Sequence, residues 1–420
     1  MSPLVHLLSA RCKLCSERTV TYSYLRSIYK KSQNTTSVRS TRGFSITGCS
    51  STGHGGYRER EKAIPFGGVT TMCHKSYSTR IPPEKKKVYQ NPKLCYVWNP
   101  DLAKLIRSKI WPDGSLEKEK ALVVDCNAGP GILSKELLNA GAQRLISIER
   151  NSEFLPRLKE LQNDSDGRLL QALHADFYKM QYHGDTPYAR PVIRIKELFQ
   201  DISPVSWESD VPIKVIGCFP HRKEKTQAYL FASLMLERLS IYSYGRAQFN
   251  FFLSENCYET LTQPPGSYFK YRALSAFYQL GFDIKLLHKE PLSSFSSPST
   301  VRSSNSTDPA YLYLTQMTPK QDLFLRHKLS QQQAFVFVYF MRQSLSKRSA
   351  KLTEIIEKWA PGCSHIVTEM GLSKKTRSGD VNGETLLRIF MSICEEDTFN
   401  GSWMGEDAMT YALKAIPAVL

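Results

Sequence analysis

The stretch VVDCNAGPGILSKELLNAGAQRLISIER, residues 123–150, contains two apolar runs joined by a glycine turn and an amphipathic segment. The runs at 121–125 and 144–149 have the length and composition of buried parallel strands. The segment between them has the pattern of a helix that ends at Gly141. Strand, glycine turn, helix and strand in this order predict one unit of a parallel sheet, with the turn at its carboxyl edge.

The same alternation continues along the chain. Five further apolar runs have the length of strands: 169–176, 212–220, 246–254, 282–290 and 310–317. The last two flank a Ser- and Pro-rich loop, so we expect them to form a hairpin. Helical periodicity separates the earlier runs, most clearly at 226–242. These patterns predict an α/β fold with a mostly parallel, doubly wound sheet.

No strand pattern follows Pro319. The sequence after it has the pattern of four or five helices. Its longest apolar run, AFVFVYFM at 334–341, is too short to span a bilayer and predicts a buried helix. The sequence therefore predicts a sheet domain at residues 91–319 and a helical domain at residues 320–420.

The amino-terminal segment has the composition of a targeting sequence. Residues 1–56 contain eight Lys and Arg residues, many Ser and Thr residues, and Glu17 as their single acid. This pattern is typical of a mitochondrial transit peptide, although a basic tail without a targeting role has the same composition. Residues 57–90 stay polar and predict a flexible linker. Residues 1–56 carry seven of the +17 net charges, so the rest of the chain keeps +10. This positive charge favours an anionic partner such as nucleic acid.

The ten cysteines indicate neither a disulfide framework nor a metal site. Cys12 and Cys15 form a CxxC pair, but the pair lies in the transit-like segment and no second pair follows at zinc spacing. We therefore expect no metal ion.

Residues suited to a nucleoside ligand stand at the ends of three consecutive strands. Gly129 and Gly131 follow the first strand, where a missing side chain lets a ligand approach the backbone. Glu149 ends the second strand, where a carboxylate can accept hydrogen bonds from ribose hydroxyls. Asp176 ends the third strand, where it can accept from an adenine amine. A turn that is only tight, with acids that only cap helices, would place the same residues here, so both interpretations remain open.

The glycine spacing discriminates between two cofactors. A dinucleotide site uses GxGxxG, but Ser134 stands in the third glycine position and Pro130 lacks a backbone donor for a pyrophosphate. The turn therefore favours S-adenosyl-L-methionine over NAD. An NAD-dependent oxidoreductase is the less favoured alternative.

The motifs VVDCNAGPGILSKELLNAGA, ISIER and HADF, with a later proline turn and a helical tail, resemble the rRNA adenine N6,N6-dimethyltransferase family over roughly residues 90–400. The resemblance implies the class I S-adenosyl-L-methionine-dependent methyltransferase fold. The segment CYVWNP stands where the family has a further cofactor-binding segment. The cofactor-binding residues that the resemblance implies are Val97, Asp125, Gly129, Gly131, Glu149 and Asp176.

The catalytic motif of that family is altered here. Its methyltransferases carry Asn-Leu-Pro-Tyr or Asn-Leu-Pro-Phe after the fourth strand, where the Asn and the Pro carbonyl hold the adenine amine and the ring stacks on the flipped base. The matching positions hold Cys218, Pro220 and His221. A thiol lacks the paired amide groups of Asn, so we expect weak methyl transfer. A nucleophilic Cys218 is less favoured, because only the adjacent His221 could act as its base.

The start of the helical tail is strongly basic. From Lys320 to Lys351, Asp322 is the single acid against seven Lys and Arg residues. Lys347 and Arg348 precede a helix and are expected to bind nucleic-acid phosphate, although an ordinary solvated face has the same composition. The later motifs resemble the mitochondrial transcription factor branch of the family, which implies that this pair contacts promoter DNA.

Two functions follow from these patterns. The resemblance favours a transcription initiation factor of the mitochondrial matrix and nucleoid, which acts with the single-subunit mitochondrial RNA polymerase in promoter melting. The alternative is an S-adenosyl-L-methionine-dependent dimethyltransferase of mitochondrial small-subunit rRNA. The altered position Cys218 favours the first function, and the complete set of cofactor residues supports the second.

Overall fold

The computed structural model of the protein describes residues 95–180, 195–200, 202–220, 223–296 and 311–396. The expected transit peptide, the expected linker and His221 lie outside the described residues. No helix within the described residues is long and apolar enough to cross a membrane. The same residues contain no cluster of His, Cys, Asp and Glu side chains that could hold a metal ion.

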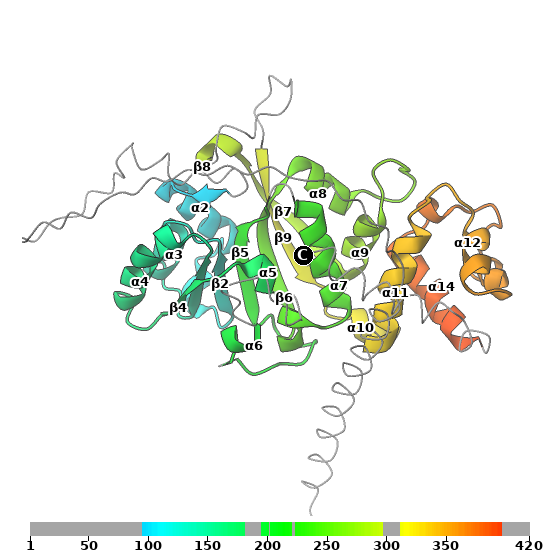
Figure 1. Cartoon of the computed structure of the whole chain (residues 1–420), viewed down its shortest axis with the longest axis horizontal. Helices are drawn as coiled ribbons and strands as arrows, with labels where there is room; N and C mark the ends of the chain where they lie inside the picture. Colours follow the sequence, from blue (N-terminus) through cyan, green and yellow to red (C-terminus); the bar gives the residue numbers. More distant parts are fainter. Residues whose placement is uncertain (1–94, 181–194, 201, 221–222, 297–310, 397–420) are drawn as a thin grey trace, which may run out of the picture. The chain divides into compact units, whose positions relative to one another are not determined.

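Seven strands form one mixed sheet (Figure 1). They are β2 (Leu122–Cys126), β3 (Leu145–Glu149), β4 (Leu169–His174), β5 (Ile213–Cys218), β6 (Ala247–Ser254), β7 (Phe282–Pro291) and β9 (Tyr311–Pro319). The order across the sheet is β4-β3-β2-β5-β6-β9-β7, and β9 runs in the opposite direction to the other six strands. The predictions of a doubly wound sheet and of a terminal hairpin are confirmed. The strand order reverses between β2 and β5, where such sheets bind their ligands.

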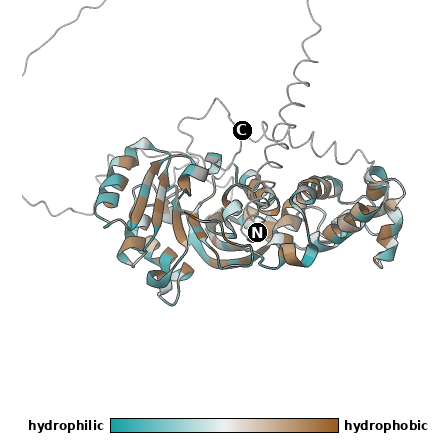
Figure 2. Ribbon diagram, turned by 90° about the horizontal axis from the view of Figure 1, so that it is seen from below, coloured by the Kyte–Doolittle hydropathy of each residue, from teal (hydrophilic) through white to brown (hydrophobic). Residues whose placement is uncertain are grey.

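The central strands are buried on both faces, as their uninterrupted apolar sequences predict. Successive side chains of a strand point to opposite faces. Accordingly, Leu122 and Val124 of β2 belong to one hydrophobic cluster, whereas Val123 belongs to the cluster on the other face. In Figure 2 the strands of the sheet are mainly brown, whereas brown and teal residues alternate along the helices.

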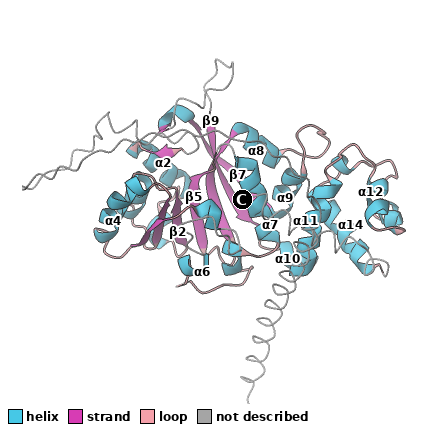
Figure 3. Ribbon diagram, in the orientation of Figure 1, coloured by secondary structure: helices cyan, strands magenta, loops and turns pink. Residues whose placement is uncertain are grey.

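Helices cover both faces of the sheet (Figure 3). Helices α2 (Pro100–Ile110) and α3 (Ile132–Asn139) pack on the face that contains Val123. Helices α7 (Glu224–Leu236) and α9 (Ala273–Gly281) pack on the opposite face. The sequence patterns did not predict α9 or the helix before it. The remaining helices of this part are α4 (Leu155–Asn163), α5 (Phe177–Met180), α6 (Ile195–Leu198) and α8 (Glu255–Thr262).

A two-stranded ribbon lies outside the main sheet. It pairs β1 (Tyr96–Val97) with β8 (Phe295–Ser296) in antiparallel register. The chain passes from β1 into α2, whose first turn is capped by the Asn99 side chain, which accepts from the Asp101 backbone amide at 2.9 Å. The cap and the ribbon together fix the position of β1.

The carboxyl-terminal part is helical. Its members are α10 (Leu323–His327), α11 (Gln331–Ser344), α12 (Leu352–Trp359), α13 (Ile366–Glu369) and α14 (Gly383–Glu395). The apolar run at 334–341 lies in α11, and most of its side chains are buried, as predicted. One continuous hydrophobic cluster includes Phe231 of α7 and Phe390 of α14. The domain boundary after Pro319 stays a prediction, because the core is continuous across it.

Helix α14 crosses α9 at very short range. A Cβ atom added at Gly383 would lie 2.5 Å from the carbonyl oxygen of Ala276 and 3.1 Å from the Cβ of Leu280. Only glycine allows the two backbones to approach this closely. The helical tail is therefore in direct backbone contact with α9, a helix that packs on the sheet.

Candidate functional site

Four of the residues singled out in the sequence lie at one edge of the sheet. Asp125 is near the end of β2, Glu149 ends β3, Asp176 follows β4, and Cys218 ends β5. These four strands are parallel neighbours in the sheet. Their carboxyl ends therefore meet at the same edge, on both sides of the switch point.

The glycine turn after β2 depends on two left-handed glycines. Gly129 has φ +55° and its amide donates to Oε2 of Glu149 at 2.7 Å. Gly131 has φ +77° and a Cβ added there would lie 2.8 Å from Leu158 of α4. The first glycine therefore faces the ligand side of the turn, and the second permits close packing of α4.

Glu149 is fully enclosed by protein groups. Its side chain has no exposed surface, and it accepts hydrogen bonds from the amides of Gly129 and Asn151, at 2.7 and 2.6 Å. The hydroxyl of Tyr96 lies 3.4 Å from Oε1 and also donates to it. Burial raises the pKa of this carboxyl above its ordinary value.

The side chain of Tyr96 packs against both Gly129 and Glu149, which are hydrogen-bonded to each other. It is only 2% exposed, and its Cδ1 would lie 2.6 Å from a Cβ added at Gly129. Its ring also packs edge-on against Phe154, with centroids 5.3 Å apart. The sequence interpretation did not include Tyr96, although it selected the adjacent Val97.

Asp125 lies beside this site in a polar cluster. Its Oδ2 accepts from the hydroxyl of Ser134 at 2.5 Å, and that hydroxyl lies 2.7 Å from the hydroxyl of Ser147. Burial raises the pKa of Asp125 to about 7. The carboxyl is therefore only partly charged near neutral pH.

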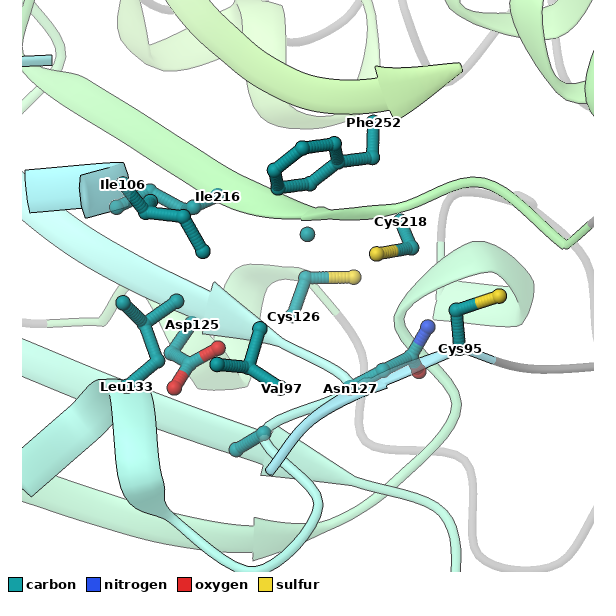
Figure 4. Close-up of a pocket in the computed structure, with 12 residues that line it drawn as sticks. Cys95, Val97, Ile106, Asp125, Cys126, Asn127, Leu133, Ile216, Cys218 and Phe252 are labelled. Atoms are coloured by element: carbon teal, nitrogen blue, oxygen red, sulfur yellow. The ribbon is translucent and has the colours of Figure 1, made fainter. Parts of the chain in front are cut away.

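A small pocket lies between the end of β2 and β1 (Figure 4). Val97, Asp125 and Cys218 line it together with Asn127. Asn127 is 7% exposed, has φ +60°, and neither polar atom of its side chain has a hydrogen-bond partner in the described part of the chain. Such an unsatisfied buried amide is costly without a ligand or water. The sequence reasoning missed Asn127, although its position two residues before Gly129 places it in the same turn.

Asp176 is partly exposed at the third strand end. Its Oδ1 accepts from the amide of Tyr178 at 3.2 Å, and its Oδ2 lies 3.6 Å from a guanidinium nitrogen of Arg150. The side chain of Asp176 keeps 17% of its surface exposed. It can therefore accept a further hydrogen bond from a ligand.

Two positions of the altered catalytic motif lie in the described residues, Cys218 and the half-buried Pro220. The Cys218 side chain is buried, and burial raises the pKa of its thiol well above the ordinary value. This disfavours a thiolate nucleophile. The carbonyl of Pro220 accepts from the amide of Lys223 at 2.8 Å and thereby closes a turn.

The site contains polar groups that suit S-adenosyl-L-methionine and one side chain that occupies its place. Glu149, Asp176 and Asn127 are polar groups of the kind that hold a nucleoside and an amino acid. However, Tyr96 makes two contacts that were expected of the cofactor: it lies against the backbone of Gly129, and it donates to Glu149, the predicted partner of the ribose. The cofactor does not fit this arrangement unless Tyr96 moves.

Three chain segments form a second, basic site, which we call the basic surface: residues 263–272, 346–351 and 373–380. They meet at Gly379, where an added Cβ would lie 3.0 Å from both Arg348 and Tyr268. The segments contain Asp380 as their single acid. Their basic residues are Lys270, Arg272, Lys347, Arg348, Lys351, Lys374, Lys375 and Arg377.

Lys347 and Arg348, the two residues predicted to bind phosphate, have different environments on this surface. Lys347 is exposed. Arg348 is half-buried, and its Nε donates to the carbonyl of Tyr268 at 2.6 Å. Arg348 therefore also helps to hold the surface together. Sequence reasoning did not include Arg272 or Arg377, which reach the surface only through folding.

Comparisons with known proteins agree with this architecture. The family model of ribosomal RNA adenine dimethylases matches residues 85–395. The bovine (Bos taurus) protein named dimethyladenosine transferase 2, mitochondrial, is 30% identical over 360 residues, covering 83% of this chain and 86% of that protein. The human (Homo sapiens) protein of the same name is 29% identical over 309 residues, covering 70% and 77%.

A solved structure of a dimethyladenosine transferase from Plasmodium falciparum has a TM-score of 0.47 and 14% identity, and covers 71% of this chain and 96% of that one. The cofactor of the family is S-adenosyl-L-methionine. The fold is that of the class I methyltransferases that use it. The family model extends over both the sheet and most of the helical tail, so the chain belongs to the ribosomal RNA adenine dimethylase family.

Proposed function

We propose that this chain is a mitochondrial transcription initiation factor built on the scaffold of an rRNA adenine dimethylase. The observation that carries the proposal is the contrast between its two sites. Tyr96 closes the cofactor site and Cys218 is buried beside it, whereas the basic surface exposes Lys347 to solvent. Nucleic-acid binding therefore needs no rearrangement, and methyl transfer does.

Methyl transfer is secondary in this proposal for two reasons. Losing well-placed hydrogen bonds to a reacting group costs about 10²–10³ in rate, and Cys218 cannot replace both amide groups of Asn. The closed site adds the free energy that is needed to displace Tyr96. Both effects lower the rate without affecting the basic surface.

The polymerase partner rests on the resemblance of the later motifs to the mitochondrial transcription factor B2 branch. In this role the chain joins the single-subunit mitochondrial RNA polymerase and stabilises melted promoter DNA. The mitochondrial location is supported by the composition of residues 1–56 and by the names of the bovine and human relatives. Promoter DNA would place the protein in the matrix, at the nucleoid.

Run-off transcription tests the proposal. Mitochondrial RNA polymerase should initiate at a promoter with this chain present and much less without it. Lys347→Ala should reduce initiation. It should also reduce the magnitude of the slope of log K against log[salt], by about 0.9 on duplex DNA or about 0.7 on a single strand. Lys285→Ala, which removes an exposed lysine of β7 outside the basic surface, is the matched control. No stimulation by the parent chain would refute the proposal.

Arg348 needs a different variant. Arg348→Ala also removes the hydrogen bond to the Tyr268 carbonyl, so it can disturb the surface itself. Arg348→Lys keeps the charge and removes the Nε donor. Comparison of the two variants separates loss of phosphate binding from loss of structure.

Dimethylation of small-subunit rRNA is the second candidate function. It is favoured by Glu149 and Asp176 at consecutive strand ends and by the unpaired amide of Asn127. A tritiated-methyl transfer assay on an rRNA hairpin, run beside the transcription assay, tests it. Robust dimethylation by the unmodified chain, with initiation lost in Glu149→Ala, would make the enzyme the better account.

A further inference from the structure

Phe269 is the most exposed large hydrophobic side chain in the described part of the chain. It keeps 89% of its surface accessible, whereas Leu325, the next, keeps 70%. Phe269 lies in the loop between α8 and α9, within the first segment of the basic surface. A single exposed hydrophobic residue needs no explanation by itself. The surroundings of Phe269 are what distinguish it.

The loop that carries Phe269 is fixed to the helical tail by hydrogen bonds from residues before and after Phe269 in the chain. The amide of Gly266 donates to the carbonyl of Gly379 at 2.8 Å, and the Tyr268 hydroxyl donates to Asp380 at 2.6 Å. On the other side, the buried hydroxyl of Tyr271 donates to the carbonyl of Val381 at 3.0 Å. The loop is therefore rigidly held, and Phe269 is presented to solvent instead of folding back.

The segments next to this ring are basic, and Lys270, the residue after it, is ion-paired with Glu259 at 3.0 Å. Arg377 stacks over the Tyr268 ring, with 5.7 Å between the guanidinium carbon and the ring centroid. Burial, and then the charge of Arg272, lower the pKa of the Arg348 guanidinium. Two guanidinium groups thus repel one another beside the Phe269 loop. A bound anion would relieve this repulsion.

We propose that Phe269 is a stacking platform for an unpaired base of single-stranded nucleic acid, whose phosphates lie on the basic surface. The inference rests on the proposed function and names the ligand of the same surface. An exposed aromatic ring among Lys and Arg residues is the arrangement with which proteins bind single strands without sequence preference. Melted promoter DNA supplies such a strand.

A single strand fits this surface better than a duplex does. The bases of a duplex are stacked on one another and cannot lie flat on a surface ring, while the phosphates of both forms are accessible. Phe269 should therefore contribute to single-strand binding alone. Lys347 should contribute to both forms, because it recognises charge only.

Fluorescence anisotropy with the full chain tests this difference. The probes are a fluorescein-labelled oligothymidylate and a labelled duplex of the same length. Phe269→Ala should weaken binding of the oligothymidylate about 5- to 150-fold, since a stacked base is worth that much in affinity. Its salt slope should not change, and its duplex affinity should stay that of the parent. Phe269→Trp should retain single-strand affinity.

The matched control is Leu325→Ala, which removes the other highly exposed hydrophobic side chain, in α10 and outside the basic surface. It should leave both affinities unchanged. Single-strand affinity within twofold of the parent in Phe269→Ala would overturn the stacking role. An equal loss on duplex would also overturn it and would indicate a wedge between base pairs.

The failure of this inference can be told apart from the failure of the proposed function. If Lys347→Ala flattens the salt slope and Phe269→Ala has no effect, only the stacking platform is wrong. If Lys347→Ala leaves the slope unchanged, the basic surface itself does not bind nucleic acid. If Phe269→Ala lowers run-off transcription while single-strand affinity is unchanged, the ring contacts a protein, and the stacking role is refuted.

Discussion

Replacing Tyr96 with alanine should open the cofactor site at a cost that follows from the burial of its ring. Truncation of a buried aromatic side chain typically destabilises a protein by about 3–5 kcal/mol. Glu149 offers a polar partner to water in the opened space, so we expect the lower end of that range. A loss of about 3 kcal/mol lowers the Tm of a domain of this size by roughly 6–10 °C.

The same substitution should create a strong response to cofactor. A ligand at about 100 times its Kd stabilises a protein by about 2.7 kcal/mol. S-adenosyl-L-methionine or its demethylated product should therefore restore most of the lost Tm in Tyr96→Ala. The parent should gain much less, because Tyr96 must first leave Gly129 and Glu149. Thermal unfolding and titration calorimetry of the full chain measure both effects.

Phe154→Ala is the matched control for this experiment. Phe154 is also buried and packs on Tyr96, but the structure places it outside the contact with Gly129. Phe154→Ala should lower the Tm by a similar amount and should not raise the affinity for the cofactor. Equal cofactor affinity in the parent and in Tyr96→Ala would refute the reasoning, because the ring would then not compete with the ligand.

Three further predictions concern the same edge of the sheet. Glu149→Ala should abolish cofactor binding by calorimetry and leave promoter-dependent initiation largely intact; unchanged binding would refute the pocket assignment. Cys218→Asn with His221→Tyr should raise tritiated-methyl transfer to an rRNA hairpin, most visibly with Tyr96→Ala present, and strong transfer by the parent would show that the altered motif matters little. Asp125, with a pKa near 7 when folded and about 3.9 when unfolded, holds its proton better in the native state, so native stability should fall as pH rises from about 4 to above 7. Asp125→Asn should flatten that dependence in urea unfolding measured across the same pH range.

The strands and the residues at their ends could be predicted because their signals are local. A run such as LISIE specifies its strand within five residues, and parallel strands must bring their carboxyl ends to one edge. The placement of Glu149 beside Gly129 follows from that rule alone. Likewise, the polar loop between two apolar runs was sufficient to predict that β7 and β9 are neighbours.

The closure of the site could not be predicted, because it depends on contacts between distant residues. Tyr96 and Glu149 are separated by 53 positions. Tyr96 lies in β1, which pairs with β8, a strand of two residues with no sequence signal of its own. The basic surface has the same origin, since Arg272, Arg348 and Arg377 come from three distant segments. Periodicity describes each of these segments and does not indicate that they meet.

The backbone contact between α9 and α14 has a mechanical consequence. No side chain separates Gly383 from the carbonyl of Ala276, so the two helices cannot move closer together at this point. If a DNA strand pulled on the carboxyl-terminal helices, the force would pass through this backbone contact to α9 and from α9 to the sheet. A stiff contact of this kind suits the proposed role, in which the protein holds two DNA strands apart.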